Sequence, residues 1–372
     1  DPPYNTGNEG WVYNDKVNSP LINNWLGKTV DKNDLTKHDK WLCMMVPRIK
    51  LLRELMTDDG VIFISIDEHE INSLKSIMDE VFGELCLVSH LSILTNPKGR
   101  VLDKYFSTNH EYILVYSKSL LQKGSLVVKK SNIEITKDFP LVDDDGRYRE
   151  LELRNTHREV GKHNRKNLYY PFYFKKKNNI LSLEDNGGLK IEPNWDDGYE
   201  GCWTWGRNLA IDNLDLLVCK QVKGNYKVYR KAYSGQATKK FKTLWIDKKY
   251  HTEKGQASFN ELFDEGKDLF NAPKSVDLIK DLINVSTEEN DIILDSFAGS
   301  GTTLHAILDL NNEFGSNRQC IMVQMKEDSK DEPNKNICKN LTRERVKRAI
   351  EKYGYDSGFK YLKVGIPIDP EY

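Results

Sequence analysis

Long apolar runs, paired cysteines and a strong net charge are all lacking from this sequence, and each absence excludes a class of protein. No apolar run approaches the ~20 residues of a membrane span, and 38% hydrophobic with 30% charged residues is typical of a globular chain. The six cysteines form no CxxC pair and have no His-rich partner, which argues against structural zinc and favours free thiols in a reducing cytoplasm. The cysteines are Cys43, Cys86, Cys202, Cys219, Cys320 and Cys338.

The formal net charge of −1 conceals a basic middle of the chain. Residues 151–250 contain 20 Lys and Arg against 11 Asp and Glu, so the remainder is acidic. A local basic field suits nucleic acid, because each phosphate that is neutralised releases counterions. An ordinary lysine-rich, solvated surface accounts for the same count equally well.

Helical and strand patterns alternate in the first third of the chain. Residues 39–56 have apolar side chains at helical spacing, with a kink expected at Pro47. The continuous apolar run 61–66 predicts a strand buried on both faces, and Asp67 is expected to cap a helix that runs to Phe82. With a further strand over 112–116, this alternation predicts an α/β domain with a mainly parallel sheet.

Residues 119–262 are polar and irregular in period, which predicts an inserted domain or a set of long loops with short strands over 214–219 and 226–229. Regular α/β character then returns. Strands are expected over 291–295 and 320–324, and helices over 276–283, 302–310 and 341–353.

One glycine turn has the pattern of a ligand site. A short apolar strand ends at Asp295, Gly299 and Gly301 permit a tight turn, and a helix is expected to start at Thr302. Helix N-termini present free N–H groups, and ligands of open α/β sheets bind at the carboxyl ends of strands. The third glycine of the dinucleotide fingerprint GxGxxG is missing after Thr303, so a nicotinamide cofactor is not favoured.

The chain opens with Asp1-Pro2-Pro3-Tyr4, a rigid corner that carries an acid and an aromatic ring. A carboxylate and a backbone carbonyl can each accept one hydrogen of an exocyclic amine and make its nitrogen a better nucleophile, while two prolines fix the backbone that aims them. Tyr4 offers a flat face on which a flipped base can stack. Taken alone, such a tetrapeptide is more often a simple turn than a functional site.

The two motifs together resemble those of the S-adenosylmethionine-dependent DNA amino-methyltransferases, with the catalytic motif first, as in the beta class. Further segments are similar to the modification subunits of type III restriction-modification systems. They are Asp1 to Gly7, Trp11 to Asp15, His38 to Leu42, Pro47-Arg48, Asp59 to Asp67, Asn109 to Tyr112 and Phe270 to Ser275; within the insertion only Trp203 to Arg207 shares the likeness.

The resemblance implies a Rossmann-like methyltransferase sheet with an inserted target-recognition region. It assigns residues 1–118 to the catalytic half, 119–262 to target recognition and 263–372 to the cofactor half. It places catalysis at Asp1, Pro2, Pro3 and Tyr4. It places S-adenosyl-L-methionine at Asp295, Phe297, Gly299, Gly301, Thr302, Thr303, Ala272, Pro273, Lys274 and Gln324. Gln324 stands where many methyltransferases have an acidic ribose ligand, and no metal is required.

The resemblance also implies double-stranded DNA as the substrate and adenine N6 as the methylated atom. Cytosine N4 remains the nearest alternative, although Ser more often precedes the two prolines in those enzymes. A non-catalytic DNA-binding subunit with the same fold is a third.

An interleaved aromatic and cationic stretch is the best candidate for DNA contact within the insertion. A hydrophobic strand explains it equally well. The candidates are Arg165, Lys166, Tyr169, Tyr170, Lys175, Lys176 and Lys177.

Two expectations concern the complete protein. A mostly apolar strand is expected directly before Asp1, because the family has one there. The likeness also implies a homodimer in the cytoplasm and raises the question of a restriction subunit as partner.

Overall fold

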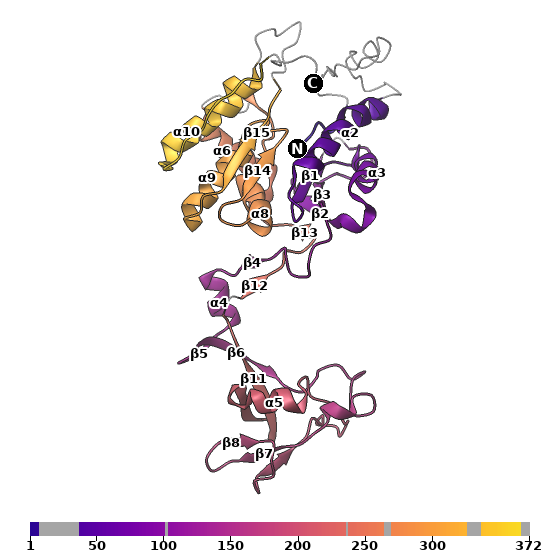
Figure 1. Cartoon of the computed structure of the whole chain (residues 1–372), viewed down its shortest axis with the longest axis vertical. Helices are drawn as coiled ribbons and strands as arrows, with labels where there is room; N and C mark the ends of the chain where they lie inside the picture. The colour runs from indigo at the N-terminus through magenta and orange to yellow at the C-terminus, as the bar shows by residue number, and fades with distance from the viewer. Residues whose placement is uncertain (7–36, 101–102, 236, 264–268, 326–335, 366–372) are drawn as a thin grey trace. The chain divides into compact units, whose positions relative to one another are not determined.

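The computed structural model describes residues 1–6, 37–100, 103–235, 237–263, 269–325 and 336–365 (Figure 1). The chain forms two compact units: residues 1–127 with 240–372, and residues 128–239. The family-like segment Trp11 to Asp15, together with Gly7, lies outside the described residues. In the described part, no helix combines the length and the apolar character that crossing a membrane requires.

The first part of unit one packs two helices against a four-stranded sheet with the strand order β1-β3-β2-β13. The expected helix, strands and Gly83 helix end are all present. The elements are α2 (Lys37–Leu55), β1 (Val61–Ile66), α3 (Ile71–Phe82), the 3₁₀ turn η1 (Glu84–Cys86), β2 (Leu87–Leu94), β3 (His110–Ser117) and β13 (Leu244–Trp245).

The sheet is not mainly parallel here, contrary to expectation. Helix α3 carries the chain from β1 to β2 as a crossover, but β3 then returns from the 95–109 loop, lies between these two strands and pairs antiparallel with both. A connection without a crossover helix leaves neighbouring strands antiparallel. Only β13 pairs parallel with β2.

Asp67 does not cap α3, which corrects a second expectation. Its carboxylate accepts from the backbone N–H of His69 at 3.0 Å and from the His69 ring at 2.9 Å. The helix therefore begins at Ile71, after Glu70, and its apolar face joins α2 and β1 in one core. That core includes Trp41, Met45, Ile66, Leu74 and Met78.

The second part of unit one carries the glycine turn. Strands β14 and β15 are parallel, with Asp295 opposite Met322, so both strands end at the same edge. Helices α8 and α9 bury Val276, Ile283, Ala306, Ile307 and Leu310 against each other and against these strands. The elements are η4 (Lys248–Tyr250), α6 (Thr252–Asn260), α8 (Val276–Ser286), β14 (Ile292–Asp295), α9 (Thr302–Phe314), β15 (Gln319–Met322), the π turn η5 (Cys338–Thr342) and α10 (Arg343–Tyr353).

Unit two is built from short strands and runs from 128 to 239, so residues 119–127 and 240–262 belong to unit one rather than to the insertion. Its strands form the sheets β10-β11-β6-β5, β8-β7-β9 and β12-β4. The elements are β4 (Val128–Lys129), α4 (Asn132–Asp138), β5 (Leu141–Asp143), β6 (Gly146–Glu152), η2 (Lys166–Leu168), β7 (Phe172–Lys175), β8 (Ile180–Ser182), β9 (Leu189–Ile191), α5 (Arg207–Asp212), η3 (Leu214–Leu216), β10 (Leu217–Val222), β11 (Asn225–Tyr233) and β12 (Thr238–Lys239).

A two-residue turn joins β10 to β11, with Lys223 and Gly224 both at positive φ (51° and 88°). Such turns match the twist of a hairpin. At its other end, β10 starts three residues later than the strand expected over 214–219, because residues 214–216 form the 3₁₀ turn η3 that precedes it.

Candidate active site

The Asp1–Tyr4 corner is held by side chains from α2, β1 and β3. The Trp41 indole donates to the Pro3 carbonyl at 2.7 Å, and the Ser65 hydroxyl donates to Asp1 Oδ1 at 3.1 Å. Tyr4 Oη donates to Glu111 Oε2 at 2.8 Å. Among the described residues, none donates a hydrogen bond to the Pro2 carbonyl.

Asn5 turns the chain away from the corner and is fully buried, with φ at 61°. Its side-chain amide donates to Glu70 Oε1 at 2.5 Å and to the Lys37 carbonyl at 3.1 Å. The His38 ring contacts the same Glu70 oxygen at 2.6 Å. Asparagine is one of the few residues that enter the left-handed region readily, so a side chain with the right backbone preference also supplies the anchor.

A charged cluster adjoins Tyr4. Lys274 Nζ lies 2.6 Å from Tyr4 Oη, makes an ion pair with Glu111 and lies 3.7 Å from Asp1 Oδ1. Burial, with the neighbouring Glu111 carboxylate, raises the pKa of Tyr4 well above its usual value. Burial opposes ionisation of Glu111, but Lys274 and Tyr4 outweigh it and the pKa of Glu111 falls below its ordinary value.

The glycine turn lies at the end of β14. Asp295 accepts from Phe297 N at 3.1 Å and from Thr303 Oγ1 at 2.5 Å, so its carboxylate ties the strand to the first turn of α9. Gly299 and Gly301 have φ of 48° and 80°, in the region that favours glycine. Gln324, just after β15, accepts from Gly299 N at 2.7 Å.

The π turn η5 and helix α10 support this turn with one side chain each. Thr342 Oγ1 donates to the Gly299 carbonyl at 2.6 Å, and the fully buried Arg345 donates to Ser300 Oγ and Thr302 Oγ1 at 2.9 and 2.7 Å. Sequence reasoning missed both residues. The signal was present, because Arg345 falls between Leu341 and Ala349 at helical spacing and therefore shares their buried face.

The segment before α8 lies beside the turn and adopts a strained backbone. Ala272 has φ at 54°, and its N–H donates to Gln256 Oε1 on α6 at 3.2 Å. A Cβ on Gly255 would lie 2.0 Å from the Pro273 carbonyl oxygen, so α6 and this segment meet at a distance that only glycine permits. Gly255 had no sequence signal beyond being a glycine inside a helix.

The residues at the turn have the chemistry that a methyl-donor cofactor requires. A Cβ on Gly299 would meet only Phe270 at 3.8 Å and the Phe297 carbonyl at 3.9 Å, so the turn leaves room above its backbone. The Phe270 ring and the Phe297 carbonyl border that space, and α9 begins at Thr302, directly after the turn. Polar cofactor groups would find backbone N–H donors there.

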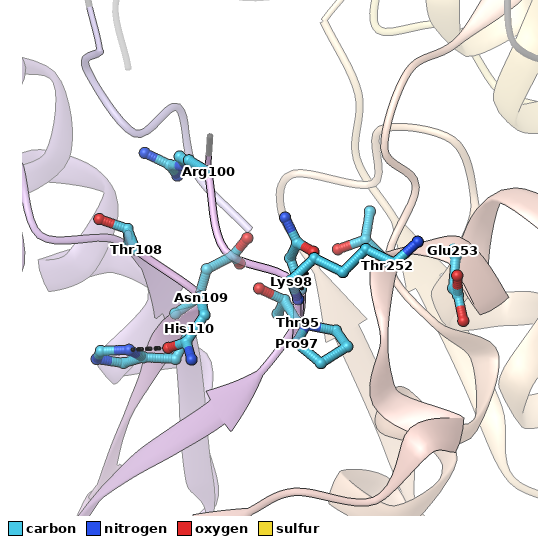
Figure 2. A pocket seen from close by; sticks show the side chains of 11 residues that line it. Thr95, Pro97, Lys98, Arg100, Thr108, Asn109, His110, Thr252 and Glu253 are labelled. Atoms are coloured by element: carbon cyan, nitrogen blue, oxygen red, sulfur yellow. Dashed lines mark hydrogen bonds between the residues drawn. The ribbon is translucent and has the colours of Figure 1, made fainter. Parts of the chain in front are cut away.

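A polar cavity of about 370 Å³ opens beside the corner and includes Glu111 in its wall. Figure 2 shows Arg100, Thr108, Asn109 and His110 on one side and Thr252 and Glu253 on the other. Through Glu111 the cavity is in direct contact with the Tyr4 hydroxyl. Of its lining, only Asn109 to Glu111 had drawn attention in the sequence.

Five of the seven predicted DNA contacts in unit two are exposed, and the two tyrosines are not. Arg165, Lys166 and Lys175 to Lys177 are exposed, and Lys176 lies 4.5 Å from the centre of the Tyr226 ring. Tyr170 is buried in the unit core, and its hydroxyl donates to the Trp205 carbonyl. The DNA contact predicted for Tyr170 is therefore wrong, because its ring alternates inward with Phe172 and Phe174. Tyr169 is half-buried, with Lys162 over its ring.

Several known proteins are similar in sequence to this chain over most of its length. The EcoPI Mod subunit of a type III restriction-modification enzyme from Escherichia phage P1 is 33% identical over 88% of this chain and 53% of its own length. The type II methyltransferase M.KpnI from Klebsiella pneumoniae is 31% identical over 87% of this chain and 73% of its own. The EcoP15I Mod subunit from Escherichia coli is 31% identical over 98% of this chain and 61% of its own.

The chain thus spans about half the length of the EcoPI Mod subunit. The family model described as DNA methylase matches residues 1–335, which include the Asp1–Tyr4 corner and the Gly299 turn. This chain belongs to the DNA methylase family.

Proposed function

We propose that this chain transfers a methyl group from S-adenosyl-L-methionine to the N6 amine of adenine in double-stranded DNA. The observation that carries the proposal is the contact between Lys274 and Tyr4, which joins the segment beside the glycine turn to the acid-tipped corner. The proposed acceptors for the amine hydrogens and the proposed site for the methyl donor thus belong to the same compact unit. The named relatives, restriction-modification enzymes and methyltransferases, support the same activity.

The cofactor is assigned to the space over the Gly299 backbone, and it supplies an electrophilic methyl group when bound. The Phe270 ring and the Phe297 carbonyl border that space, and the Lys274 ammonium, four residues beyond Phe270, reaches the Tyr4 hydroxyl. Asp295 and Gln324 shape the turn through Phe297 N, Thr303 and Gly299 N. Gln324 remains our candidate for the ribose contact, with its amide fixed against the turn.

Two acceptors at the corner hold the target amine. Asp1 Oδ accepts one hydrogen, and the Pro2 carbonyl accepts the other, because the Pro3 carbonyl is already bonded to Trp41. Tyr4 provides the face on which the flipped base stacks. With S-adenosyl-L-methionine bound, the amine held by these acceptors would take the methyl group as the C–S bond breaks, S-adenosylhomocysteine would leave, and the surplus amine proton would pass to solvent.

Unit two is assigned to reading the DNA. Its exposed Arg165, Lys166 and Lys175 to Lys177 supply positive charge for phosphate contacts. The relatives named as Mod subunits of restriction-modification enzymes support a restriction subunit as partner, while a homodimer in the cytoplasm is proposed on the family resemblance alone. Light scattering of the full-length protein tests the homodimer, and a monomer that methylates DNA would refute it.

The test of the activity is direct reading of modified bases in DNA from cells that express the full-length protein. We expect N6-methyladenine at one short sequence, and its loss in Asp1→Ala with cofactor affinity retained. N4-methylcytosine would overturn the choice of base. No modified base, with cofactor and DNA both bound, would favour a non-catalytic DNA-binding role.

The cofactor site has its own test in Gly299→Val. Valine at a positive φ strains the turn and fills the space over it, so we expect calorimetry to show a loss of cofactor affinity of about a hundredfold or more. Gly315→Val is the matched control, because Gly315 also has positive φ (64°) but faces open space at the end of α9. Equal cofactor affinity in both variants would move the site elsewhere.

A further inference from the structure

Lys274 belongs to a segment that the family resemblance associates with the cofactor, yet its ammonium points to the catalytic corner. It is within 2.6 Å of Tyr4 Oη, and it pairs with Glu111 on β3. It also lies 4.9 Å from the centre of the Tyr4 ring. Two of its three N–H donors are therefore already engaged by the chain itself.

We propose that Lys274 is a positioning residue that separates the charges of Asp1 and Glu111 and fixes Tyr4, so that Asp1 stays an amine acceptor and Tyr4 keeps its stacking face. This rests on the proposed methyl transfer. It gives Glu111 a role as well, as the acceptor that holds the Tyr4 hydroxyl.

The geometry of the charges supports the first half of the proposal. Asp1 and Glu111 are two carboxylates that approach one ammonium, at 3.7 Å for Asp1 and in direct contact for Glu111. Like charges that share a site drive one of the two carboxyls to take up a proton. A protonated Asp1 would donate where it has to accept, so an uncompensated Glu111 charge would weaken the hold on the amine.

Hydrogen bonding supports the second half. The Tyr4 hydroxyl donates to Glu111 and accepts from Lys274. These two bonds fix the position of the hydroxyl and thereby orient the Tyr4 ring. The lowered pKa of Glu111 keeps this acceptor ionised near neutral pH.

Other charged groups act on the same cluster and remain constant in the test. Arg100, in the loop after β2, favours the ionised form of Glu111. Asp67, after β1, acts on Tyr4. Among the described residues, neither Arg100 nor Asp67 forms a hydrogen bond with Lys274, so both act as a constant background when Lys274 is replaced.

The experiment compares Lys274→Met, Glu111→Gln and the double variant in the full-length protein, with Lys50→Met on the exposed side of α2 as control. The readouts are kcat/KM for methylation against pH and calorimetric affinity for S-adenosylmethionine. For Lys274→Met we expect the acid limb of the pH profile to move up by about one unit or more, because the compensating charge is gone. The pH profile of the double variant should return toward that of the wild type. Lys50→Met should match the wild type in both its pH profile and its cofactor affinity.

Tyr4→Phe completes the design. Lys274→Met should lower kcat/KM less in the Tyr4→Phe background than in the wild type, because the hydroxyl that Lys274 positions is then absent. A tenfold loss of cofactor affinity in Lys274→Met with an unmoved acid limb would overturn the proposal and make Lys274 a cofactor ligand. Unchanged kinetics would also overturn it. Absence of methyl transfer by the wild-type protein would instead refute the proposed function, and this role with it.

Discussion

Single hydrogen bonds fix the backbone of the Asp1–Tyr4 corner. The indole of Trp41 engages the Pro3 carbonyl, and Asn5 is anchored on Glu70. Net contributions of such bonds are about 1 kcal/mol, but here they also select which carbonyl stays available to a substrate. The effect of losing one should therefore be larger on turnover than on folding.

Trp41→Phe tests this at one position. Phenylalanine keeps most of the packing but frees the Pro3 carbonyl, so we expect kcat to fall about tenfold, as misplacement of an acceptor does, while unfolding in urea changes by about 1 kcal/mol. Trp245→Phe is the matched control, because Trp245 is also buried and donates to a backbone carbonyl at 2.7 Å. A similar loss of turnover in both variants would contradict the role given to Trp41.

His305 should make stability depend on pH. Burial, and then the Arg345 guanidinium, lower its pKa to about 4 from an ordinary value of 6.5, and it stacks on Tyr353 in its neutral form. As pH falls below about 6.5, the unfolded chain takes up the proton first. The free energy of unfolding therefore falls by up to about 3 kcal/mol by the time pH reaches about 4.

His305→Phe removes that proton and keeps the ring. Urea unfolding at several pH values between about 7 and about 4.5 should show the variant gaining on the wild type as pH falls. His157→Phe, at an exposed histidine of unit two, should show no such trend. A constant difference between His305→Phe and wild type would contradict the lowered pKa.

Secondary-structure elements set the approach of the two motifs. Strands β14 and β15 end at one edge and present the turn, while α6 presses on the segment that carries Lys274. The close approach at Gly255 leaves no room for a methyl group, since a Cβ would lie 2.0 Å from the Pro273 oxygen. The helix and the segment can only move together.

Gly255→Ala should push that segment away. We expect a loss of stability of about 1–3 kcal/mol from overpacking, despite the better helix propensity of alanine, together with weaker cofactor binding by calorimetry. Gly358→Ala serves as the control, because a Cβ there meets no atom within 4 Å. A more stable Gly255→Ala protein would show that the contact is looser than the structure has it.

At the level of elements, the sequence predicted most of what is local. The apolar run 61–66, the Gly83 helix end and the helix start at Thr302 follow from period and turn chemistry and are confirmed. Strand direction was wrong, because β3 inserts between β1 and β2 and nothing in its own residues encodes that neighbour. Asp67 was wrongly expected to cap α3. Its actual bond to His69 is as local as a cap would be, so the sequence pattern does not distinguish the two.

The whole molecule divides into two units whose site predictions were not equally accessible from sequence. The Lys274–Glu111 pair joins positions 163 apart, and its members are ordinary charged residues until the fold brings them together. In unit two the cations of the interleaved stretch are exposed, but the Tyr170 ring alternates inward with Phe172 and Phe174, which no pattern in the sequence distinguished from a DNA-facing ring. Strands β4 and β12, at the two ends of unit two, pair with each other, so its entry and exit lie together.

Exchange of residues 128–239 with those of a relative tests the assignment of DNA reading. Because both ends of the unit meet at β4 and β12, we expect the chimera to fold. It should methylate the relative's sequence and still modify adenine, as read by direct sequencing of modified bases. A chimera that keeps the original target sequence would place readout in unit one.

The contact between Tyr4 and Lys274 spans 270 positions of the chain. During synthesis the corner therefore emerges long before its partner, and all of unit two is made in between. Contacts of such separation form late, because a large loop must close first. A nascent chain would carry the acidic corner without its counter-charge, and the acceptor geometry would form only once the segment that contains Lys274 has left the ribosome.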